Sequence, residues 1–339
     1  MKDIARKLGI SVSTVSVALN NKPGVNDALR DRVFKACQKL SYDTRKITTK
    51  GGGGGGNIGF VVANRMPLKA EMYYTRMFMG AEPVAEEKHY HLLMNSVSAV
   101  SEEGLILPRC FSKDIKGLLI AGYFKTRYID LLAAQGVPVV LLEYDIPSKP
   151  LNAVKCENYM GAFDAVKYLV RRGHRAIGLI GGVKAHHSPL LRILGYWGAL
   201  HEAGLPANTE IVVENLPETT IELGYKAATE ILARKPRKLD ALFCITDNYA
   251  TGCMKAIQDF GLRIPEDISV VGFDDMEWAS HLTPPLTTVR IPKEAIGRAG
   301  LRRAIELIES GLLGKTDTPA RIVLPANLVE RSSVADRRK

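Results

Sequence analysis

Long apolar runs and patterned cysteines are both missing from this chain of 339 residues. No stretch reaches the roughly 18 consecutive apolar residues that span a bilayer, and the first residues, Met1-Lys2-Asp3, turn polar at once, unlike a signal peptide. The five cysteines are scattered and never spaced C-x-x-C, which disfavours a disulfide framework and a cysteine zinc site. We therefore expect a cytoplasmic protein without a membrane segment, whose cysteines are small buried residues.

Catalytic and metal-binding motifs are also scarce. The sequence contains no H-E-x-x-H, no G-x-S-x-G and no phosphate-binding Walker loop. Two histidine pairs, His89/His91 and His186/His187, have no evident acidic or cysteine companion, and adjacent histidines on a helix do not easily share one ion. We expect no catalytic residue, no cofactor and no metal site.

Positive charge is concentrated at one end of the sequence. Residues 1–50 hold 11 lysines and arginines against four acids, a net charge of +7, whereas the other 289 residues hold 35 against 32, a net charge of +3. A basic head on a nearly neutral body favours a protein that binds a polyanion through its head. A basic face that is only solvated is the alternative from charge alone.

Three short helices are predicted in the basic head. Apolar spacing indicates helices over residues 2–8, 12–19 and 27–40, with Ser11 and Asn26 placed to cap the second and third. Two short helices joined by a tight turn and followed by a third make the helix-turn-helix plan. The second helix is slim and rich in hydroxyl groups, which can bond to phosphates or base edges in a major groove. A small helical bundle that binds nothing is the alternative from the pattern.

The segment from Asp3 to Asn20, with Lys22-Pro23-Gly24-Val25 after it, resembles the headpiece of the LacI/GalR family of bacterial transcription regulators. In that family the helix matching residues 11–19 reads the operator. The resemblance therefore implies double-stranded DNA as a partner and a set of DNA-binding residues: Ser11, Val12, Ser13, Thr14, Ser16, Val17, Asn20 and Lys22. Many members carry arginine at the position of Val17. Because valine cannot make arginine's bidentate contact with guanine, we expect a different operator base there.

Six consecutive glycines, residues 51–56, separate the head from the body. They satisfy G-x-G-x-x-G trivially, but no strand precedes them and no helix follows, so a linker fits better than a dinucleotide site. In the resembling family this segment forms a hinge helix, and each glycine disfavours a helix, so we expect a weak hinge. A natural linker, an engineered one and stand-ins for unidentified residues all fit the run.

The body alternates apolar strands with helical stretches. Strands are expected over residues 57–63, 91–94, 117–120, 137–142, 176–180, 241–245 and 268–273. Helices are expected over residues 71–87, 126–135, 158–172, 190–203, 222–234 and 248–260. Continuous apolar strands that alternate with helices indicate parallel α/β sheets, and the length fits two of them.

The body also resembles the effector-binding core of the LacI/GalR family, through matching segments that recur in order: residues 156–162, 173–178, 192–196, 261–267, 272–275, 285–289 and 324–331. The implied fold class is α/β, with a two-lobed periplasmic-binding-protein-like (type I) core of doubly wound parallel sheets joined by three crossing strands. The expected divisions are a headpiece over 1–48, a hinge over 49–57, an N-terminal lobe over 58–156 and 287–319, and a C-terminal lobe over 157–286 and 320–339.

Ligands of such cores bind between the lobes, at the carboxyl ends of strands. The resemblance places these residues there: Tyr73, Tyr74, Asp145, Arg192, Thr246 and Asp274. Two interpretations stay open for each of the two tyrosines: its ring stacks on the ligand, or it packs in the core beneath its helix. Arg192 can hold hydroxyls or a carboxylate, and Asp274 can accept two sugar hydroxyls. We expect Asp247 to cap the helix that follows it, which leaves Thr246 as a weaker contact.

Together these features predict a DNA-binding transcription regulator, with a repressor favoured, that is controlled by a small-molecule effector such as a sugar or sugar derivative. A homodimer would place two headpieces on a pseudo-palindromic operator, and residues 334–339 show no leucine heptads of the kind that make the family's tetramers. One alternative is a solute-binding protein of the same core fold, which requires export. The other is a nucleotide-dependent α/β enzyme, which requires a phosphate loop after a strand.

Overall fold

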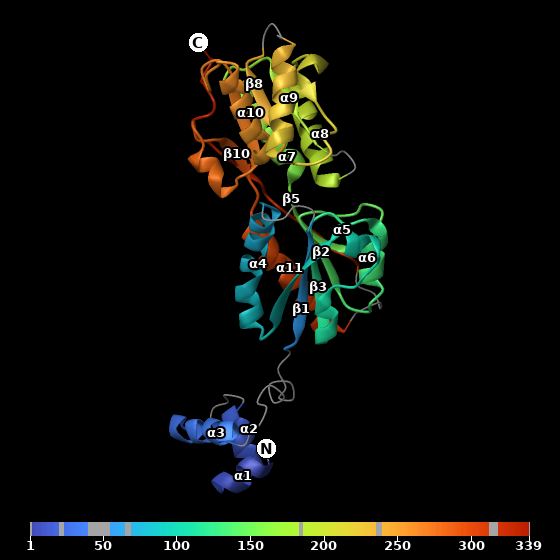
Figure 1. Ribbon diagram of the computed structural model, residues 1–339, viewed down its shortest axis with the longest axis vertical. Helices are drawn as coiled ribbons and strands as arrows, with labels where there is room; N and C mark the ends of the chain where they lie inside the picture. Colours follow the sequence, from blue (N-terminus) through green and yellow to red (C-terminus); the bar gives the residue numbers. More distant parts are fainter. Residues whose placement is uncertain are drawn as a thin grey trace.

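The computed structural model describes residues 2–19, 24–39, 55–64, 69–182, 186–234, 239–311 and 318–338. Figure 1 shows three bodies along the chain, a group of N-terminal helices and two α/β lobes. The predictions for Asn20, Lys22 and residues 49–54 of the hinge lie outside the described residues.

The head consists of α1 (Lys2–Leu8), α2 (Val12–Leu19) and α3 (Asp27–Lys39). Gly9 adopts a φ of 64°, which lets α1 end in the left-handed region. The Ser11 hydroxyl accepts the backbone N–H of Thr14 at 3.0 Å, and the Asn26 side chain accepts that of Leu29 at 2.9 Å. A small core joins the three helices and contains Ile4, Ala5, Val15, Ala18, Val33 and Ala36. The predicted helix-turn-helix is confirmed.

The N-terminal lobe is built on a six-stranded parallel sheet in the order β11-β5-β4-β3-β1-β2. Its strands are β1 (Asn57–Asn64), β2 (His91–Ser98), β3 (Ile115–Ala121), β4 (Val139–Leu142), β5 (Asn152–Cys156) and β11 (Arg321–Leu324). Its helices are α4 (Lys69–Glu87), α5 (Ala99–Glu103), α6 (Thr126–Ala133), α11 (Lys293–Ser310) and the 3-10 helix η2 (Arg109–Lys113).

The C-terminal lobe repeats this plan with the order β12-β10-β9-β8-β6-β7, in which β12 alone runs antiparallel to its neighbour. Its strands are β6 (Ile177–Ile180), β7 (Val212–Val213), β8 (Ala241–Cys244), β9 (Ser269–Asp274), β10 (Thr287–Arg290) and β12 (Asn327–Val329). Its helices are α7 (Asn158–Arg171), α8 (His187–Glu202), α9 (Ile221–Ala233), α10 (Asp247–Asp259) and the 3-10 helices η3 (Thr209–Ile211) and η4 (Glu277–His281).

Two of the expected lobe boundaries need correction. Residues 287–290 were expected in the N-terminal lobe, but they form β10, which pairs with β9 of the C-terminal lobe. Residues 321–324 were expected in the C-terminal lobe, but they form β11, which pairs with β5 of the N-terminal lobe. Within the described ranges the chain therefore crosses between the lobes three times: after β5, between β10 and α11, and between β11 and β12.

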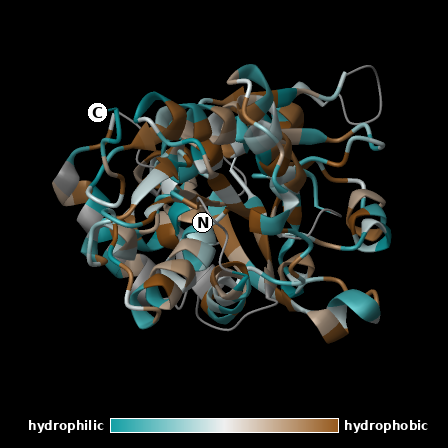
Figure 2. Ribbon diagram, turned by 90° about the horizontal axis from the view of Figure 1, so that it is seen from above, coloured by the Kyte–Doolittle hydropathy of each residue, from teal (hydrophilic) through white to brown (hydrophobic). Residues whose placement is uncertain are grey.

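Buried apolar residues fill both sheets and the facing sides of their helices. Figure 2 shows hydrophobic strands in the interior with hydrophilic segments around them. Cys110, Cys156, Cys244 and Cys253 are buried free thiols, as the sequence predicts. Over the described ranges, no helix combines the length and the apolar character that crossing a membrane requires.

Candidate functional site

The first candidate surface is the exposed side of α2 in the head. Val15 and Ala18 point into the head's core, which leaves Val12 and Ser13 exposed on the opposite side. At the start of the helix, the Ser11 hydroxyl lies 2.6 Å from the Ser13 hydroxyl oxygen and 2.8 Å from that of Thr14. Ser11 therefore holds the first turn of α2 and presents a compact, hydroxyl-rich helix end to solvent.

Ser16 and Val17 are half-buried on the same helix. Of the residues predicted to contact DNA, the structure thus places six on one short helix and its cap.

The second candidate site is a pocket between the lobes with a volume of about 150 Å³. Twelve residues line it: Tyr73, Tyr74, Tyr123, Glu143, Pro189, Arg192, Thr219, Thr246, Asn248, Asp274, Met276 and Trp278. Five of the six residues predicted for the effector site are among them. The carboxyl ends of β4, β8 and β9 all contribute to the wall, as expected for parallel sheets.

Arg192 is the best-connected side chain of the pocket. From α8, its Nε donates to Asn158 Oδ1 at 2.7 Å, and its Nη1 donates to the Ile245 carbonyl at 2.8 Å and to Asp274 Oδ1 at 2.9 Å. Its Nη2 lies 3.4 Å from Glu143 Oε1 across the lobe boundary. The guanidinium also stacks at 3.9 Å over Phe273. Protein partners thus occupy most of the donors that the sequence assigned to a ligand.

Three acidic side chains lie around this arginine or behind it. Burial raises the pKa of Glu143 to about 7, against the opposing charge of Arg192. Burial also raises the pKa of Asp274, while Arg192 and Lys293 act to lower it. Burial raises the pKa of Asp247 to about 8, and the neighbouring Asp274 adds to this. Burial therefore disfavours the charged form of all three carboxyl groups, two of which, Glu143 and Asp274, line the pocket.

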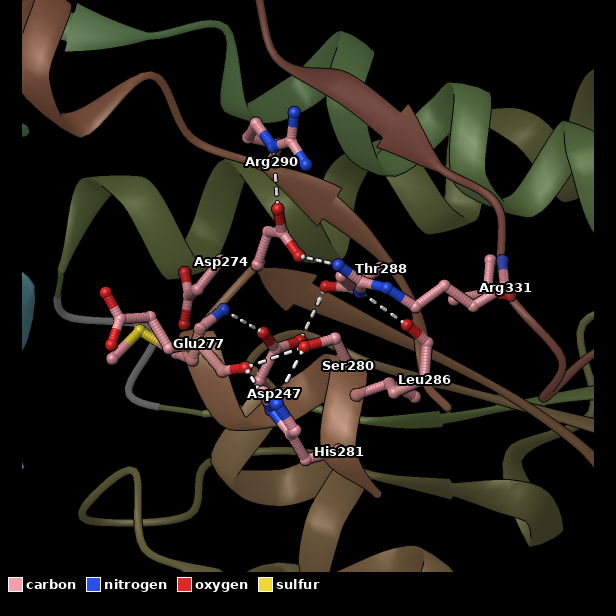
Figure 3. A network of polar contacts seen from close by, with 12 residues as sticks. Asp247, Asp274, Glu277, Ser280, His281, Leu286, Thr288, Arg290 and Arg331 are labelled. Carbon is pink, nitrogen blue, oxygen red and sulfur yellow. Dashed lines mark hydrogen bonds and ion pairs between the residues drawn. The ribbon is translucent and has the colours of Figure 1, made fainter. Parts of the chain in front are cut away.

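Thr246 rather than Asp247 caps α10, because the Thr246 hydroxyl accepts the backbone N–H of Tyr249 at 3.3 Å. The prediction that Asp247 is the cap was wrong. Asp247 is fully buried and accepts a hydrogen bond from the Thr288 hydroxyl at 2.5 Å and one from the Met276 N–H at 2.7 Å (Figure 3). Asp247 thereby ties α10 to β10 and to the loop after β9.

Asp275 has a structural role beside the pocket. Its carboxylate pairs with Arg290 Nε and Arg331 Nη2, both at 2.6 Å. Burial acts to raise the pKa of Asp275, but hydrogen bonds from the two arginines lower it. The backbone φ is 117° at Asp274 and 48° at Asp275, a strained conformation that these contacts hold in place.

Asp145 does not line the pocket, contrary to the prediction. It accepts contacts from Lys155 Nζ at 2.9 Å, from His187 Nδ1 at 2.5 Å and from Arg321 Nε at 3.5 Å. Burial acts to raise the pKa of Asp145, but hydrogen bonds from His187 and Lys155 lower it. His187 belongs to the C-terminal lobe, so the carboxylate joins the two lobes beside the pocket.

Aromatic rings form the pocket wall that belongs to the N-terminal lobe. Tyr73 and Tyr74 on α4 lie edge to face, with centroids 5.1 Å apart, and both reach the pocket rather than only the helix core. Tyr123, after β3, stacks on His186 of the other lobe at 3.9 Å. His186 and His187 therefore contact the N-terminal lobe through neighbouring side chains.

Sequence reasoning missed several lining residues. Glu143 directly follows β4 and Tyr123 is the second residue after β3, so their place at the carboxyl ends of predicted strands was a usable signal. Thr219 lies in a loop and Asn248 at a helix start, and neither had a comparable signal. The sequence offers Trp278 either as a wall of the cleft or as a residue packed beneath it, and the structure places it among the lining residues.

Known proteins place the chain in context. Residues 1–45 match the family described as "Bacterial regulatory proteins, lacI family". Residues 166–334 match the family described as "Periplasmic binding protein-like domain". The chain is 31% identical over 347 residues to the HTH-type transcriptional repressor PurR of Pectobacterium carotovorum subsp. carotovorum (strain PC1), which covers 99% of this chain and 97% of the relative. PurR of Pasteurella multocida (strain Pm70) is 30% identical and covers 99% of each chain.

Solved structures of transcription regulators are similar to this chain over nearly its whole length. The transcriptional regulator CelR in complex with cellobiose is 27% identical, with a TM-score of 0.73 over 97% of this chain and 98% of that chain. The Lac repressor dimer bound to operator and the anti-inducer ONPF is 24% identical, with a TM-score of 0.78 over 98% of both chains, and supports the fold.

Proposed function

The chain belongs to the LacI family of bacterial regulatory proteins, and from this premise we propose how it works as a transcription regulator. The exposed residues of α2 read a pseudo-palindromic operator, and a homodimer presents two such helices. The pocket binds a small neutral sugar or sugar derivative, whose binding changes the geometry of the lobes and thereby the spacing of the headpieces. The protein acts in the cytoplasm and has no catalytic activity of its own.

The observation that carries the ligand assignment is the composition of the pocket. The Arg192 guanidinium is engaged by Asn158, Ile245 and Asp274 and lies beside Glu143. Carboxylate oxygens accept hydroxyl hydrogens but repel phosphates and carboxylates. Tyrosine rings offer flat apolar faces to a sugar ring. A cavity of about 150 Å³ can hold a six-membered ring such as benzene.

Self-association is supported by exposed apolar side chains that follow one another along the chain from β2 to the loop after α5. Met94 is 45% exposed, Val100 77%, Leu105 42% and Ile106 56%. Exposed apolar residues at this density favour a protein interface. We expect Ile106→Glu to shift the dimer toward monomer in analytical ultracentrifugation, whereas Leu194→Glu, an equally apolar exposed position in the C-terminal lobe, leaves the sedimentation coefficient unchanged.

A thermal-shift screen tests the ligand class. The panel contains D-glucose, D-galactose, D-ribose, cellobiose, hypoxanthine and glucose 6-phosphate. A binder at 100 times its dissociation constant adds about 2.7 kcal/mol of stability. We expect a neutral sugar to raise the melting temperature and Asp274→Asn to reduce that shift. Stabilisation by glucose 6-phosphate alone contradicts the assignment.

Operator selection from a randomised duplex pool tests the DNA interface. We expect enrichment of a two-fold symmetric site, and Val17→Arg should change one position of each half-site to guanine. If the dimer neutralises about 6–10 phosphates, affinity falls by about 10³–10⁵ between 50 and 200 mM salt. Retained DNA binding after deletion of residues 1–50 contradicts the assignment.

A further inference from the structure

Lys293 is a buried lysine at the start of α11, where local physical chemistry disfavours it. Only 3% of the residue is exposed. A buried ammonium group loses its hydration, and the first turn of a helix is the positive end of the helix dipole. Burial accordingly lowers the pKa of Lys293, although Asp274 and two other aspartates act in the opposite direction. A lysine in this place requires partners that offset these costs.

The partners of Lys293 are backbone carbonyl groups of the other lobe. Its Nζ donates to the carbonyl oxygen of Asp274, at the end of β9, and lies 3.4 Å from that of Asp275. The ammonium group also lies 5.2 Å from the ring centroid of Tyr73 on α4, within the range of a cation–π contact. Because α4 and α11 belong to the N-terminal lobe and β9 to the C-terminal lobe, Lys293 joins the two lobes.

The two carbonyl groups belong to a turn that needs support. The φ of 117° at Asp274 and of 48° at Asp275 are conformations that residues other than glycine keep only when their surroundings hold them. Two arginines of the C-terminal lobe hold the side chain of Asp275. Lys293 holds the backbone of the turn from the other lobe. The turn in turn directs the Asp274 carboxylate to Arg192 and the pocket.

We infer that Lys293 is a positioning residue of the ligand site, which holds the turn at Asp274 from the N-terminal lobe and thereby keeps the Asp274 carboxylate in its binding orientation. This inference rests on the proposed ligand-binding function. Lys293 is not among the residues that line the pocket, whereas Asp274 is. The lysine therefore acts on the ligand through Asp274 and not by touching it.

The position of Lys293 couples ligand binding to the arrangement of the lobes. A ligand shifts a conformational equilibrium only by its difference in affinity for the two states. The hydrogen bond between Lys293 and the turn supplies such a difference, because Asp274 is held in place only while the lobes keep this contact. A ligand that binds to Asp274 therefore favours the arrangement in which the contact is made.

Isothermal titration calorimetry on the full chain tests this. The probes are D-glucose, D-galactose, D-ribose and cellobiose. We expect Lys293→Met to weaken the tightest binder about tenfold, because Asp274 then loses its fixed orientation. Lys167→Met is the matched control, since Lys167 Nζ donates to Glu202 at 2.6 Å and lies 5.3 Å from the Phe163 ring centroid, away from the pocket. This control should leave the dissociation constant nearly unchanged.

A double-mutant cycle makes the test specific for positioning. In the Asp274→Asn background, Lys293→Met should cause little further loss of affinity, because the carboxylate that the lysine positions is already gone. Methionine is similar to lysine in length and has no charge to bury, so we expect a folded chain, which cooperative urea unfolding checks. Lys293→Arg keeps the charge and the donors, and should bind the sugar more tightly than Lys293→Met does.

A measurement without ligand tests the turn itself. The chain has two tryptophans, of which Trp278, on η4, lies shortly after the turn. Trp197→Phe therefore leaves Trp278 as the single tryptophan. In this background, Lys293→Met should increase the quenching of Trp278 fluorescence by acrylamide, because the turn has lost one of its supports. Lys167→Met should leave the quenching unchanged.

The outcomes separate this inference from the proposed function. If Asp274→Asn weakens the binding of a sugar but Lys293→Met does not, the positioning role is wrong and the proposed ligand class stands. If Lys293→Met weakens binding equally in the parent and in Asp274→Asn, the lysine does not act through Asp274 and the inference is overturned. If none of the four sugars binds the parent, the ligand class fails and the quenching decides alone. Increased quenching in Lys293→Met then supports the inference, and unchanged quenching overturns it.

Discussion

The two walls of the pocket are made of different chemistry. The N-terminal lobe supplies three tyrosines and Glu143, whereas the C-terminal lobe supplies Arg192, Asp274 and the amide and hydroxyl groups of its loops. We call the side from the N-terminal lobe the aromatic wall and the side from the C-terminal lobe the polar wall. The polar wall is held in place by hydrogen bonds and ion pairs within its own lobe, through Asp247, Asp275 and their partners. The difference suggests that one lobe selects hydroxyl positions while the other covers the face of a ring.

The aromatic wall reaches the polar wall through a few contacts across the lobe boundary. Arg192 approaches Glu143, His187 contacts Asp145, and the Ser188 hydroxyl donates to the Glu143 carbonyl at 3.1 Å. On the other side of the pocket, Arg76 Nη1 pairs with Glu277 at 3.0 Å. Lys293, at the start of α11, adds a further link, because its Nζ donates to the carbonyl oxygens of Asp274 and Asp275.

Removing Arg192 should have the largest effect, because both walls depend on it. Arg192→Ala removes the guanidinium that contacts both Glu143 and Asp274 and leaves only Lys293 as a nearby cation, which costs about 3–5 kcal/mol. Urea denaturation of the full chain measures this. Arg263→Ala, which breaks an exposed ion pair with Asp267, is the control and should leave the midpoint nearly unchanged. A loss below about 1 kcal/mol in Arg192→Ala contradicts the account of the polar wall.

The raised pKa of Asp247 predicts that stability falls as the pH rises. The folded state keeps this proton up to about pH 8, whereas an unfolded aspartate loses it near 3.8. The folded state therefore binds more protons in this range, and stability falls until the pH passes about 8. Between pH 6.5 and 8 the loss amounts to about 2 kcal/mol.

Asp247→Asn should flatten this decline in urea titrations above about pH 7, because Glu143, whose pKa burial raises to about 7, adds a decline of the same sign below that pH. Measurements start at pH 6.5 because burial lowers the pKa of His174, which makes stability rise with pH at more acidic values. An equally steep decline in Asp247→Asn would show that the network does not contain this proton.

Breaking one contact between the walls should have the smallest effect. His187→Ala removes the link to Asp145, but Lys155 and Arg321 still pair with that carboxylate. We expect the closed arrangement to be less populated and the affinity for the tightest-binding sugar to fall a few-fold. His201→Ala, at the far end of α8, is the control. A fall of more than about thirtyfold would place His187 in direct contact with the ligand.

The sequence predicted most of the fold, because its strands are continuous apolar runs flanked by helices. The one long helix that it missed is α11, in which Gly297 and Gly300 lower the helical signal. A Cβ at Gly297 would lie 1.8 Å from the Met77 carbonyl oxygen, so close packing on α4 requires glycine there. The contact with α4 therefore requires glycine inside α11, although glycine has a low intrinsic helix propensity.

The candidate site was predicted less completely. The resemblance placed Asp145 in the cleft, whereas the pocket residue after β4 is Glu143, at which the backbone turns with a φ of 72°. Two further lining residues, Asn248 and Trp278, lie on separate segments that only the folded C-terminal lobe brings to one pocket. No spacing in the sequence marks such a meeting.

The central claim is that both walls form one binding site for a neutral sugar. Its most direct test is calorimetry of the tightest-binding panel sugar on the parent, on Tyr74→Leu from the aromatic wall and on Asp274→Asn from the polar wall. The account predicts weaker binding in both variants, by about tenfold or more for Asp274→Asn, whose hydrogen bond involves a charged group. A parent-like dissociation constant in either variant would contradict it.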